Sequence, residues 1–553
     1  MAAKSKEIKV KSQKELSLVP EPAVSLSNRP SSLVIGSRGS DLALWQANFI
    51  KAKLIELGVK VEIKIIKTQG DKIQDVSLDK LEGKGFFTKE LEEALLKKEI
   101  DLAVHSHKDL PTENPKGLSI AAVSYREDPS ELLLINKDAV DEKVKFGFKK
   151  GAVVGTSSAR RKSQLLAFRP DIKIEDLRGN VPTRIAKLKD SKYDVIMLAS
   201  AGINRLNIDL TEFHSELLDP KEFIPAPAQG VLALQIRDDD KALSELLKNL
   251  NEKEVQDTIA IERKVLNLFD GGCQLPLGVY CETGENEHGE TIYKVWATKA
   301  DAWNAPVKAV YLQSKHPETL AEKVMEKINK IKPTSVYITR NKKPQDVFVE
   351  NLTKLGFTVH AKSMIEILEI PLKKFEFPRA EWVFFASKNA VKYFFDQKPQ
   401  LQTVKFAVVG KSTNEELRKY NKRADFIGQS TDTRMIGKQF SALVGRKIVL
   451  FPQAKGSIKT IQHQFPGKDQ VIDLIVYETI KNSIDDIPKC NVLVFTSPSN
   501  VDSYFEKHKI DPDQKVVAMG DATANALRLK DIRAHGMPPE FTDMGLVQAV
   551  LSL

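Results

Sequence analysis

The sequence has little cysteine, few aromatic residues and no long apolar run. Only three of its 553 residues are cysteine, and none are spaced as Cys-x-x-Cys, which excludes a disulfide framework and favours a reducing, cytoplasmic setting. No apolar run is long enough to span a bilayer. Residues 1–32 lack the apolar stretch of a secretory signal and are predicted to be a disordered leader. We therefore expect no membrane attachment.

Positive charge exceeds negative charge, with 84 lysines and arginines against 74 acidic residues and a net charge of +10. Such a balance suits either nucleic acid or a small substrate that carries several carboxylates. Aromatic residues make up only 7% of the chain, and the arginine-rich motifs contain glycine, serine and threonine instead of the interleaved aromatics of single-strand binders. We therefore predict a small polyanionic ligand and no nucleic acid.

Short apolar runs that end in small residues alternate with amphipathic segments along the chain. Residues 86–100, FFTKELEEALLKKEI, predict a helix that Thr88 can cap. Residues 101–106, 151–158 and 193–202 are short enough for strands that lead into helices. This is an α/β pattern, in which ligands bind beyond the carboxyl ends of the strands. A domain boundary is expected near Lys332.

The second half of the sequence contains an internal repeat. Ser387 and Ser497, Gly410 and Gly520, and Thr413 and Thr523 are the repeated landmarks, and each pair is 110 residues apart. A constant offset at three landmarks predicts two similar α/β lobes with a cleft between them.

Arginines follow several predicted strands. In VVGTSSARR, a strand leads through Gly155 into a helix whose first turn holds Arg160 and Arg161. Cations are unfavourable at that end of a helix, so we expect an anion to compensate them. The alternative is a solvated, charged turn. Further candidates at strand ends are Arg38, Ser40, Thr156, Ser158, Arg178, Arg184 and Arg205.

The motif HSHKDLP allows two interpretations. If the preceding strand continued, His105, His107 and Asp109 would share one face, as ligands of a metal do. No further ligands are evident, so we expect no metal. In the other interpretation, Lys108 and Asp109 lie at the strand end, where Asp109 stays ionised among cations and stabilises a cationic intermediate. A structural ion pair would fit the same position.

Seven motifs in residues 33–330 together resemble the hydroxymethylbilane synthase (porphobilinogen deaminase) family: SRGSDLALWQA, GKGFFTKELEEALL, DLAVHSHKDLP, VGTSSARR, LRGNVPTR, PAPAQG and GGCQLPLG. The resemblance implies two lobes like those of a periplasmic binding protein, plus a small α+β domain. It also implies that Cys273 carries a dipyrromethane cofactor through a thioether. The implied reaction joins four porphobilinogen units into hydroxymethylbilane and releases ammonia at each step.

The same resemblance implies roles for individual residues. Asp109 would be the catalytic carboxylate, with Lys108 beside it. The residues implied or expected to bind the acetate and propionate groups of cofactor and substrate are Arg38, Ser40, Lys108, Thr156, Ser158, Arg160, Arg161, Arg178, Arg184, Arg205 and Gln229. Two positions depart from the family: His107 replaces its usual methionine and Gln69 its usual arginine, so we assign no contact near Asp71.

The second half resembles uroporphyrinogen-III synthase through VGKSTNEEL, VYET, FTSPSNV and AMGDATANAL. The implied fold is two α/β lobes joined by a two-stranded link, and the implied reaction closes hydroxymethylbilane into uroporphyrinogen III with inversion of ring D. The residues implied to line the cleft are Thr413, Tyr477, Ser497 and Thr523, and Tyr477 could assist departure of the hydroxyl group. Helix capping explains each serine and threonine equally well.

We therefore expect a monomeric α/β enzyme with both activities. The predicted deaminase domains are residues 33–130 with 231–246, residues 131–230, and residues 247–331. The predicted synthase lobes are residues 332–370 with 488–553, and residues 371–487. Two alternatives are an inactive or regulatory C-terminal half, and a two-lobed anion-binding protein without catalysis.

Overall fold

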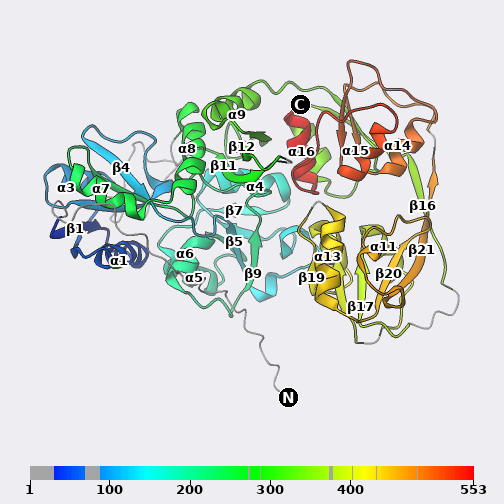
Figure 1. The fold of residues 1–553 in the computed structure, drawn as a ribbon, viewed down its shortest axis with the longest axis horizontal. Coiled ribbons are helices and arrows are strands. Elements are labelled where there is room, and N and C mark those ends of the chain that lie inside the picture. Colours follow the sequence, from blue (N-terminus) through cyan, green and yellow to red (C-terminus); the bar gives the residue numbers. More distant parts are fainter. Residues whose placement is uncertain are drawn as a thin grey trace.

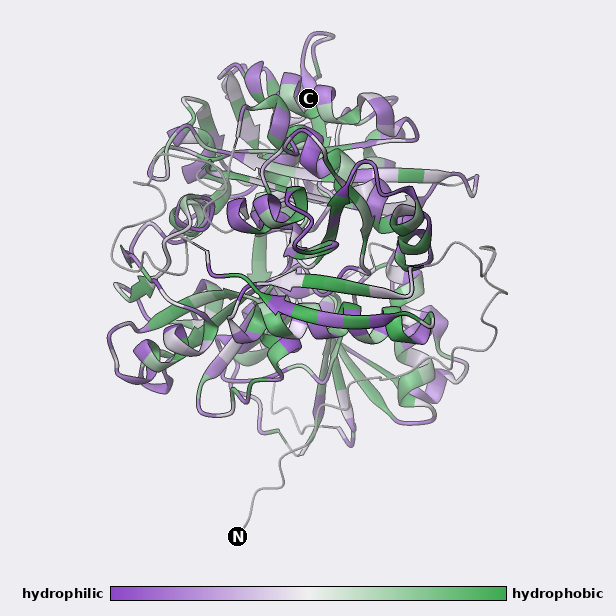
Figure 2. Ribbon diagram, turned by 90° about the vertical axis from the view of Figure 1, so that its left-hand side faces the viewer, coloured by the Kyte–Doolittle hydropathy of each residue, from purple (hydrophilic) through white to green (hydrophobic). Residues whose placement is uncertain are grey.

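The computed structural model describes residues 30–68, 88–271, 275–286, 288–372, 378–401, 403–430, 432–482 and 484–553. Within these ranges the strands form five sheets, each covered by helices (Figure 1). The strands are largely hydrophobic, whereas the surrounding helices alternate between hydrophobic and polar residues (Figure 2). Within the same ranges, no helix combines the length and apolar character that crossing a membrane requires.

The first sheet defines domain 1 and has the strand order β2-β1-β3-β10-β4. Its core joins apolar strand residues such as Ile35 and Leu234 to helix residues such as Leu54 and Leu243. The strands are β1 (Ser32–Ser37), β2 (Lys60–Ile65), β3 (Leu102–Ser106), β4 (Leu118–Val123) and β10 (Leu232–Arg237), and the helices are α1 (Asp41–Glu56), α3 (Lys89–Leu96) and α7 (Lys241–Leu247).

Two details of domain 1 differ from the sequence prediction. Thr88 directly precedes α3, but its side chain does not cap the helix. The strand β3 ends at Ser106 and is followed by a single 3-10 turn, His107–Asp109. The alternative of a continued strand through Asp109 is therefore wrong, and Lys108 and Asp109 lie just beyond the strand end, as the other interpretation placed them.

The second sheet defines domain 2 and has the order β7-β6-β8-β5-β9. Short apolar strands end at small residues, and helices begin directly after them, as the alternating pattern predicted. The strands are β5 (Glu131–Ile135), β6 (Val153–Gly155), β7 (Lys173–Glu175), β8 (Val195–Ala199) and β9 (His214–Leu218), and the helices are α4 (Ala159–Phe168), α5 (Val181–Lys189) and α6 (Ser200–Leu206). A β-carbon at Gly155 would lie 2.8 Å from the Tyr193 ring, so the turn before α4 needs glycine.

A three-stranded antiparallel sheet with two helices defines domain 3. Its elements are α8 (Lys253–Leu268), β11 (Leu277–Glu285), β12 (Thr291–Lys299), β13 (Lys308–Ser314) and α9 (Leu320–Asn329).

The second half of the chain forms two lobes, as the repeat predicted. Lobe 1 is a parallel sheet of order β15-β14-β22-β23. Its elements are β14 (Ser335–Ile338), α10 (Val347–Lys354), β15 (Thr358–Ala361), β22 (Val492–Phe495), α14 (Pro498–Tyr504), β23 (Lys515–Ala518), α15 (Asp521–Arg528) and α16 (Asp543–Leu551).

Lobe 2 carries the order β21-β20-β17-β18-β19, and β16 pairs antiparallel with β21 to form the expected two-stranded link. Its elements are β16 (Ile365–Glu369), β17 (Trp382–Phe385), α11 (Lys388–Phe395), β18 (Lys405–Val408), α12 (Lys411–Arg418), β19 (Phe426–Ile427), α13 (Thr433–Val444), β20 (Val449–Ala454) and β21 (Val471–Lys481). In Figure 1 the link lies at the far edge from domains 1 to 3.

Candidate active site

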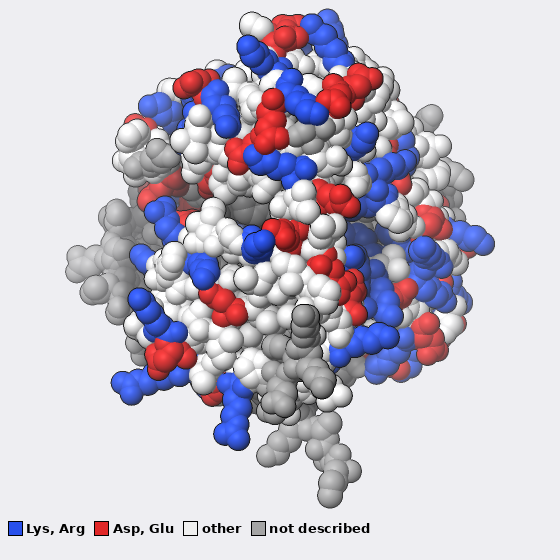
Figure 3. All heavy atoms as spheres, turned by 90° about the vertical axis from the view of Figure 1, so that its right-hand side faces the viewer, with Lys and Arg blue, Asp and Glu red and all other residues white. Residues whose placement is uncertain are grey.

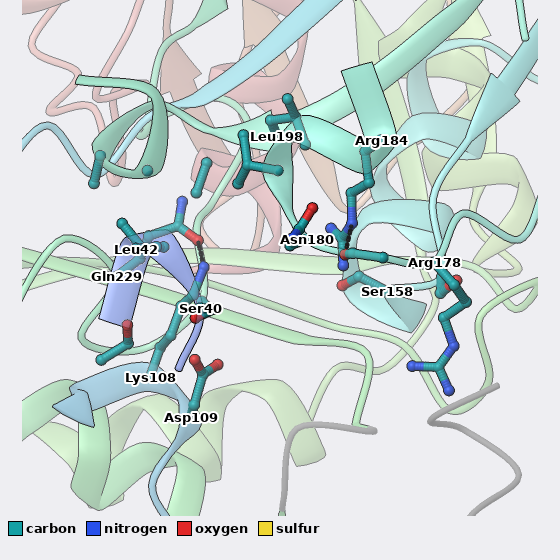
Figure 4. A pocket seen from close by; sticks show the side chains of 18 of the residues that line it. Ser40, Leu42, Lys108, Asp109, Ser158, Arg178, Asn180, Arg184, Leu198 and Gln229 are labelled. Atoms are coloured by element: carbon teal, nitrogen blue, oxygen red, sulfur yellow. Dashed lines mark hydrogen bonds between the residues drawn. The ribbon is translucent and has the colours of Figure 1, made fainter. Parts of the chain in front are cut away.

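A cavity of about 830 Å³ opens between domains 1 and 2 (Figure 4). Turns at the ends of β1, β3, β6 and β8 supply much of its wall, which is where an α/β protein binds ligands. The residues predicted from sequence that line it are Arg38, Ser40, Lys108, Asp109, Thr156, Ser158, Arg160, Arg161, Arg178, Arg184, Arg205 and Gln229. The fold therefore brings together residues up to 191 positions apart, from Arg38 to Gln229.

Asp109 and Lys108 enter the cavity from the 3-10 turn after β3. Asp109 is exposed to the cavity, and its side chain projects into it beside that of Lys108 (Figure 4). Lys108 Nζ donates to Gln229 Oε1 at 3.2 Å, and Gln229 Nε2 donates to the Pro129 carbonyl at 2.7 Å. A buried glutamine from the segment before β10 thus orients the lysine.

The cavity is electrostatically positive. Burial lowers the pKa of Arg184 to about 10, and the positive charges of Arg161 and Arg178 add to this effect. Burial likewise lowers the pKa of Lys108, although Asp109 acts in the opposite direction. Cationic side chains that lower one another's pKa in this way are stabilised by a bound anion. The site is therefore suited to a ligand with several carboxylates.

Arg160 and Arg161 are compensated from within the protein. Both guanidinium groups donate to the buried carboxylate of Glu131, at 2.5 and 2.7 Å. Burial alone would raise the pKa of Glu131, but the charges of Arg161 and Arg160 outweigh it and lower that pKa to about 2. The expected anion beside α4 therefore exists. The sequence prediction omitted Glu131. Its signal was a single charged residue at the start of an otherwise apolar strand.

We expect Glu131→Gln to destabilise the protein by about 3–5 kcal/mol, because it leaves two buried arginines without their counter-charge. Since the folded pKa is about 2 and the ordinary value 4.5, the stability from Glu131 is complete above pH 4.5 and is lost as the pH falls toward 2. Urea unfolding at several pH values measures both effects. The exposed Glu175→Gln is the control, and equal midpoints for the two variants would contradict the role of Glu131.

Several of the remaining predicted residues make hydrogen bonds with the backbone. Arg184 Nε donates to the Gly179 carbonyl at 2.8 Å, and an Arg205 nitrogen donates to the Gly230 carbonyl at 2.6 Å. Ser40 and Ser158 cap α1 and α4, so capping accounts for part of their role. Asn180, which the sequence prediction omitted, caps α5 and also lines the cavity.

A second site is expected where the two link strands meet lobes 1 and 2. Met364, just before β16, donates its backbone N–H to Asn500 at the start of α14. At the other end, the Tyr477 hydroxyl lies 3.2 Å from Ser387, the cap of α11. The five residues of β16 span about 13 Å, which sets the scale of the separation between these two contacts along the link.

The predicted cleft residues of this second site lie at helix starts. Thr413 and Thr523 are the third residues of α12 and α15 and are buried, at 3% and 4% exposed. Ser497 caps α14, as the capping alternative foresaw. Tyr477 is 8% exposed and lies on the link itself.

Residues 33–245 match the family model described as "Porphobilinogen deaminase, dipyromethane cofactor binding domain". A porphobilinogen deaminase of Trichlorobacter lovleyi is 47% identical over 253 residues, which cover 45% of this chain and 79% of that protein. The chain belongs to the porphobilinogen deaminase family. Domains 1 to 3 are called the deaminase half below.

Residues 346–548 match the model described as "Uroporphyrinogen-III synthase HemD", and lobes 1 and 2 are called the synthase half. Among solved structures, uroporphyrinogen-III synthetase from Helicobacter pylori is 16% identical and covers 38% of this chain and 96% of its own, with a TM-score of 0.30. The periplasmic VFT2 domain of Bordetella pertussis BvgS is 13% identical and covers 42% and 93%, with a TM-score of 0.27.

The predicted attachment residue Cys273 lies outside the described residues, between Gly271 and Leu275. Its neighbours approach the cavity of the deaminase half, because Leu266, Leu275 and Leu277 all line it. A β-carbon at Gly271 would lie 2.8 Å from Leu266 and 2.9 Å from Leu275. This glycine lets the chain pass between two leucines, which is a packing role that the sequence interpretation did not foresee.

The two histidines of HSHKDLP are both buried and have different neighbours. His105 lies on β3 with its Nε2 atom 3.1 Å from Gln235 Oε1, and burial lowers its pKa to about 4. His107 is also buried, with a pKa lowered to about 3 by burial and then by Arg263. In the described part of the chain, no three histidine, cysteine or acidic residues are grouped as metal ligands.

Proposed function

We propose that the chain catalyses two consecutive reactions: assembly of four porphobilinogen units into hydroxymethylbilane, and closure of that product to uroporphyrinogen III. The chain carries the domains of both enzyme families. The observation that carries the first activity is the positive cavity in which the exposed carboxylate of Asp109 lies beside Lys108 and near several arginines.

The dipyrromethane cofactor fits this cavity. Its carboxylates require cations, which Arg184, Arg205 and Lys108 supply from both domains. Its pyrrole rings require apolar surface, which Leu275 and Leu277 supply beside the proposed attachment residue. The bound cofactor provides the pyrrole carbon to which the first substrate unit is joined. We propose that Cys273 holds it through a thioether.

The residues of the cavity are proposed to have different roles in the reaction. The arginine guanidinium groups bind carboxylates in pairs of hydrogen bonds and so fix each ring in place. Loss of ammonia from porphobilinogen leaves a positive charge on the incoming unit. The exposed carboxylate of Asp109 stabilises that charge where it develops, and this is electrostatic catalysis by a preorganised group. Gln229 holds Lys108 in place through their hydrogen bond.

The synthase half is proposed to act on the linear product at the edges of its two lobes. The starts of α11, α12, α14 and α15 follow the carboxyl ends of their strands, and helix starts favour anions such as the eight carboxylates of hydroxymethylbilane. Tyr477 is proposed to donate a hydrogen bond to the departing hydroxyl group. Burial raises the pKa of Tyr477, so its hydroxyl stays protonated and able to donate.

Incubation of the pure protein with porphobilinogen tests both activities, because the oxidised products identify each step. Uroporphyrin III is the expected product. Uroporphyrin I alone would show that the synthase half is inactive. The second candidate, a two-lobed anion-binding protein, predicts no covalent cofactor, and an intact mass equal to the bare sequence mass would favour it.

We expect Tyr477→Phe to lower the rate of uroporphyrinogen III formation by about 100-fold, because a proton donor in the transition state contributes about that much or more. Porphobilinogen consumption stays unchanged, since the deaminase half is intact. The ratio of III to I isomers measures the effect. Tyr420→Phe is the control, because the Tyr420 hydroxyl bonds Asp396 on the outer side of lobe 2. An unchanged isomer ratio in Tyr477→Phe would contradict the proposal.

Small-molecule substrates are typical of both families, and we propose that the protein acts as a cytoplasmic monomer that binds no nucleic acid. Acidic and basic side chains are interspersed over much of the face in Figure 3, although basic side chains gather toward its right-hand side. Light scattering tests the oligomeric state, and a gel shift at physiological salt tests for nucleic acid.

A further inference from the structure

The two lobes of the synthase half are connected on two opposite sides. On one side, β16 and β21 form the covalent link. On the other side, lobe 1 contacts domains 2 and 3 of the deaminase half, and lobe 2 contacts domain 2 (Figure 1). Lobe 1 is attached to the deaminase half mainly by apolar packing, whereas lobe 2 is attached by ion pairs.

Lobe 1 is attached through a continuous apolar core. Phe348 and Leu352 of α10 and Leu546 of α16 belong to the same buried cluster as Phe168 of domain 2 and Val310 of domain 3. Hydrogen bonds reinforce this contact. Asn351 Nδ2 donates to the Ala167 carbonyl at 2.9 Å, and the Tyr311 N–H donates to Ser552 Oγ, also at 2.9 Å. Lobe 1 and the deaminase half therefore form a single packed unit.

Lobe 2 is attached through charges on one face of α12. Lys411, Glu415 and Arg418 are spaced i, i+4 and i+7, so they lie on one side of the helix. They face the opposite charges Asp219, Lys145 and Glu216 in domain 2. The order plus, minus, plus on α12 thus meets minus, plus, minus on domain 2, and such a pattern specifies a single docking register.

Lys145 is the centre of this contact. Its Nζ atom lies 3.1 Å from Glu222 of domain 2 and 2.9 Å from Glu415 of lobe 2, and its side chain is 24% exposed. Burial opposes its charge, yet the two carboxylates raise its pKa, so it is charged at neutral pH. Arg423 of lobe 2 and Glu142 of domain 2 add a further ion pair.

The orientation of lobe 2 depends on these charges. Its two apolar clusters contain only residues of the segment from Ile367 to Tyr477, so described apolar packing does not tie it to the deaminase half. The helix that carries the ion pairs also carries Thr413, which is expected in the cleft. Displacement of α12 would therefore change the cleft between α12 and α15.

We propose that domain 2 of the deaminase half positions lobe 2 for ring closure, and that Lys145 and Glu216 are positioning residues for the synthase reaction. The proposal rests on the proposed synthase function. Its consequence is that substitutions in the deaminase half, far from the deaminase cavity, alter the isomer of the product.

Charge reversal at one pair tests this proposal. Glu216→Arg places a cation against Arg418, whose guanidinium lies 3.3 Å from the Glu216 carboxylate. We expect uroporphyrinogen III formation to slow by about threefold to tenfold, with porphobilinogen consumption unchanged and faster hydrogen exchange in α12. Adding Arg418→Glu to this variant recreates an ion pair with the charges exchanged. We expect the rate of uroporphyrinogen III formation and the hydrogen exchange of α12 to return to their wild-type values. Glu212→Arg, on the same domain but paired with Lys189, is the matched control.

The outcomes separate this proposal from the proposed function. A wild-type protein that forms only the I isomer would overturn the synthase function itself. A wild-type protein that forms the III isomer, with Glu216→Arg forming it at the same rate, would overturn the positioning role, whether or not α12 exchange changes. A defect that the Arg418→Glu exchange fails to rescue would also overturn it.

Discussion

Asp109→Asn is expected to lower the turnover of porphobilinogen by about 100- to 1,000-fold, the range seen when one preorganised electrostatic group is removed. The substitution keeps the shape of the side chain and removes its negative charge. Asp109 is the exposed carboxylate at the end of β3, facing a cavity whose other ionisable groups are largely cations. Without it, the positive charge that develops when ammonia leaves lies in a cavity whose charged groups are mostly cations.

The effect should fall on kcat and leave KM nearly unchanged, because the arginines that bind the substrate carboxylates remain. Initial rates of porphobilinogen consumption measure it, and the intact mass confirms that the cofactor is attached before the rates are compared. Asp239→Asn, an exposed substitution on domain 1, is the control. Turnover of the Asp109 variant within about threefold of wild type would refute a role in electrostatic stabilisation.

Cys273→Ser is expected to abolish productive cofactor attachment and with it both products. A serine hydroxyl is a far weaker nucleophile than a thiol at neutral pH, so consumption of porphobilinogen should fall by at least about 100-fold. The intact mass should equal that of the bare chain, both before and after addition of porphobilinogen. A variant that gains the cofactor mass would show that attachment occurs elsewhere.

The other cysteines provide matched controls. Cys281 and Cys490 are buried, at 2% exposed each. Burial, followed by the charge of Glu262, raises the pKa of the Cys281 thiol, which makes it unreactive. We expect Cys281→Ala and Cys490→Ala to retain the cofactor mass and turnover. Loss of the cofactor mass in either variant would place the attachment residue, or its support, in the core of the protein.

Local features of the fold were predictable from the sequence because they depend on neighbouring residues. The strand, turn and helix of VVGTSSARR appear as β6, which ends at Gly155, a short connection, and α4 capped by Ser158. The offset of 110 residues predicted the two lobes of the synthase half. Where local signals competed, the sequence left two alternatives. HSHKDLP could continue the strand or end it, and the structure ends it with a 3-10 turn in which the Leu110 N–H donates to the His107 carbonyl.

Charge pairing was not predictable, because it joins residues that only the packed chain brings together. The helix position of Arg160 and Arg161 predicted an anion, but the charge of Glu131 at the start of an apolar strand does not by itself indicate that it pairs with arginines 29 and 30 residues away. The charged face of α12 was likewise readable as an ordinary solvated helix surface. Its partners lie 192 to 270 residues earlier in the chain.

The sequence by itself determined the α/β architecture, the two enzyme families and the residue types that their chemistry needs, since these follow from local patterns and motifs. Tertiary structure alone decided how those residues are used. It neutralises Arg160 and Arg161 with Glu131, orients Lys108 through Gln229, and docks α12 on domain 2. The physical reason is that the energy of a charge depends on its distance from other charges and from water, and packing sets both distances.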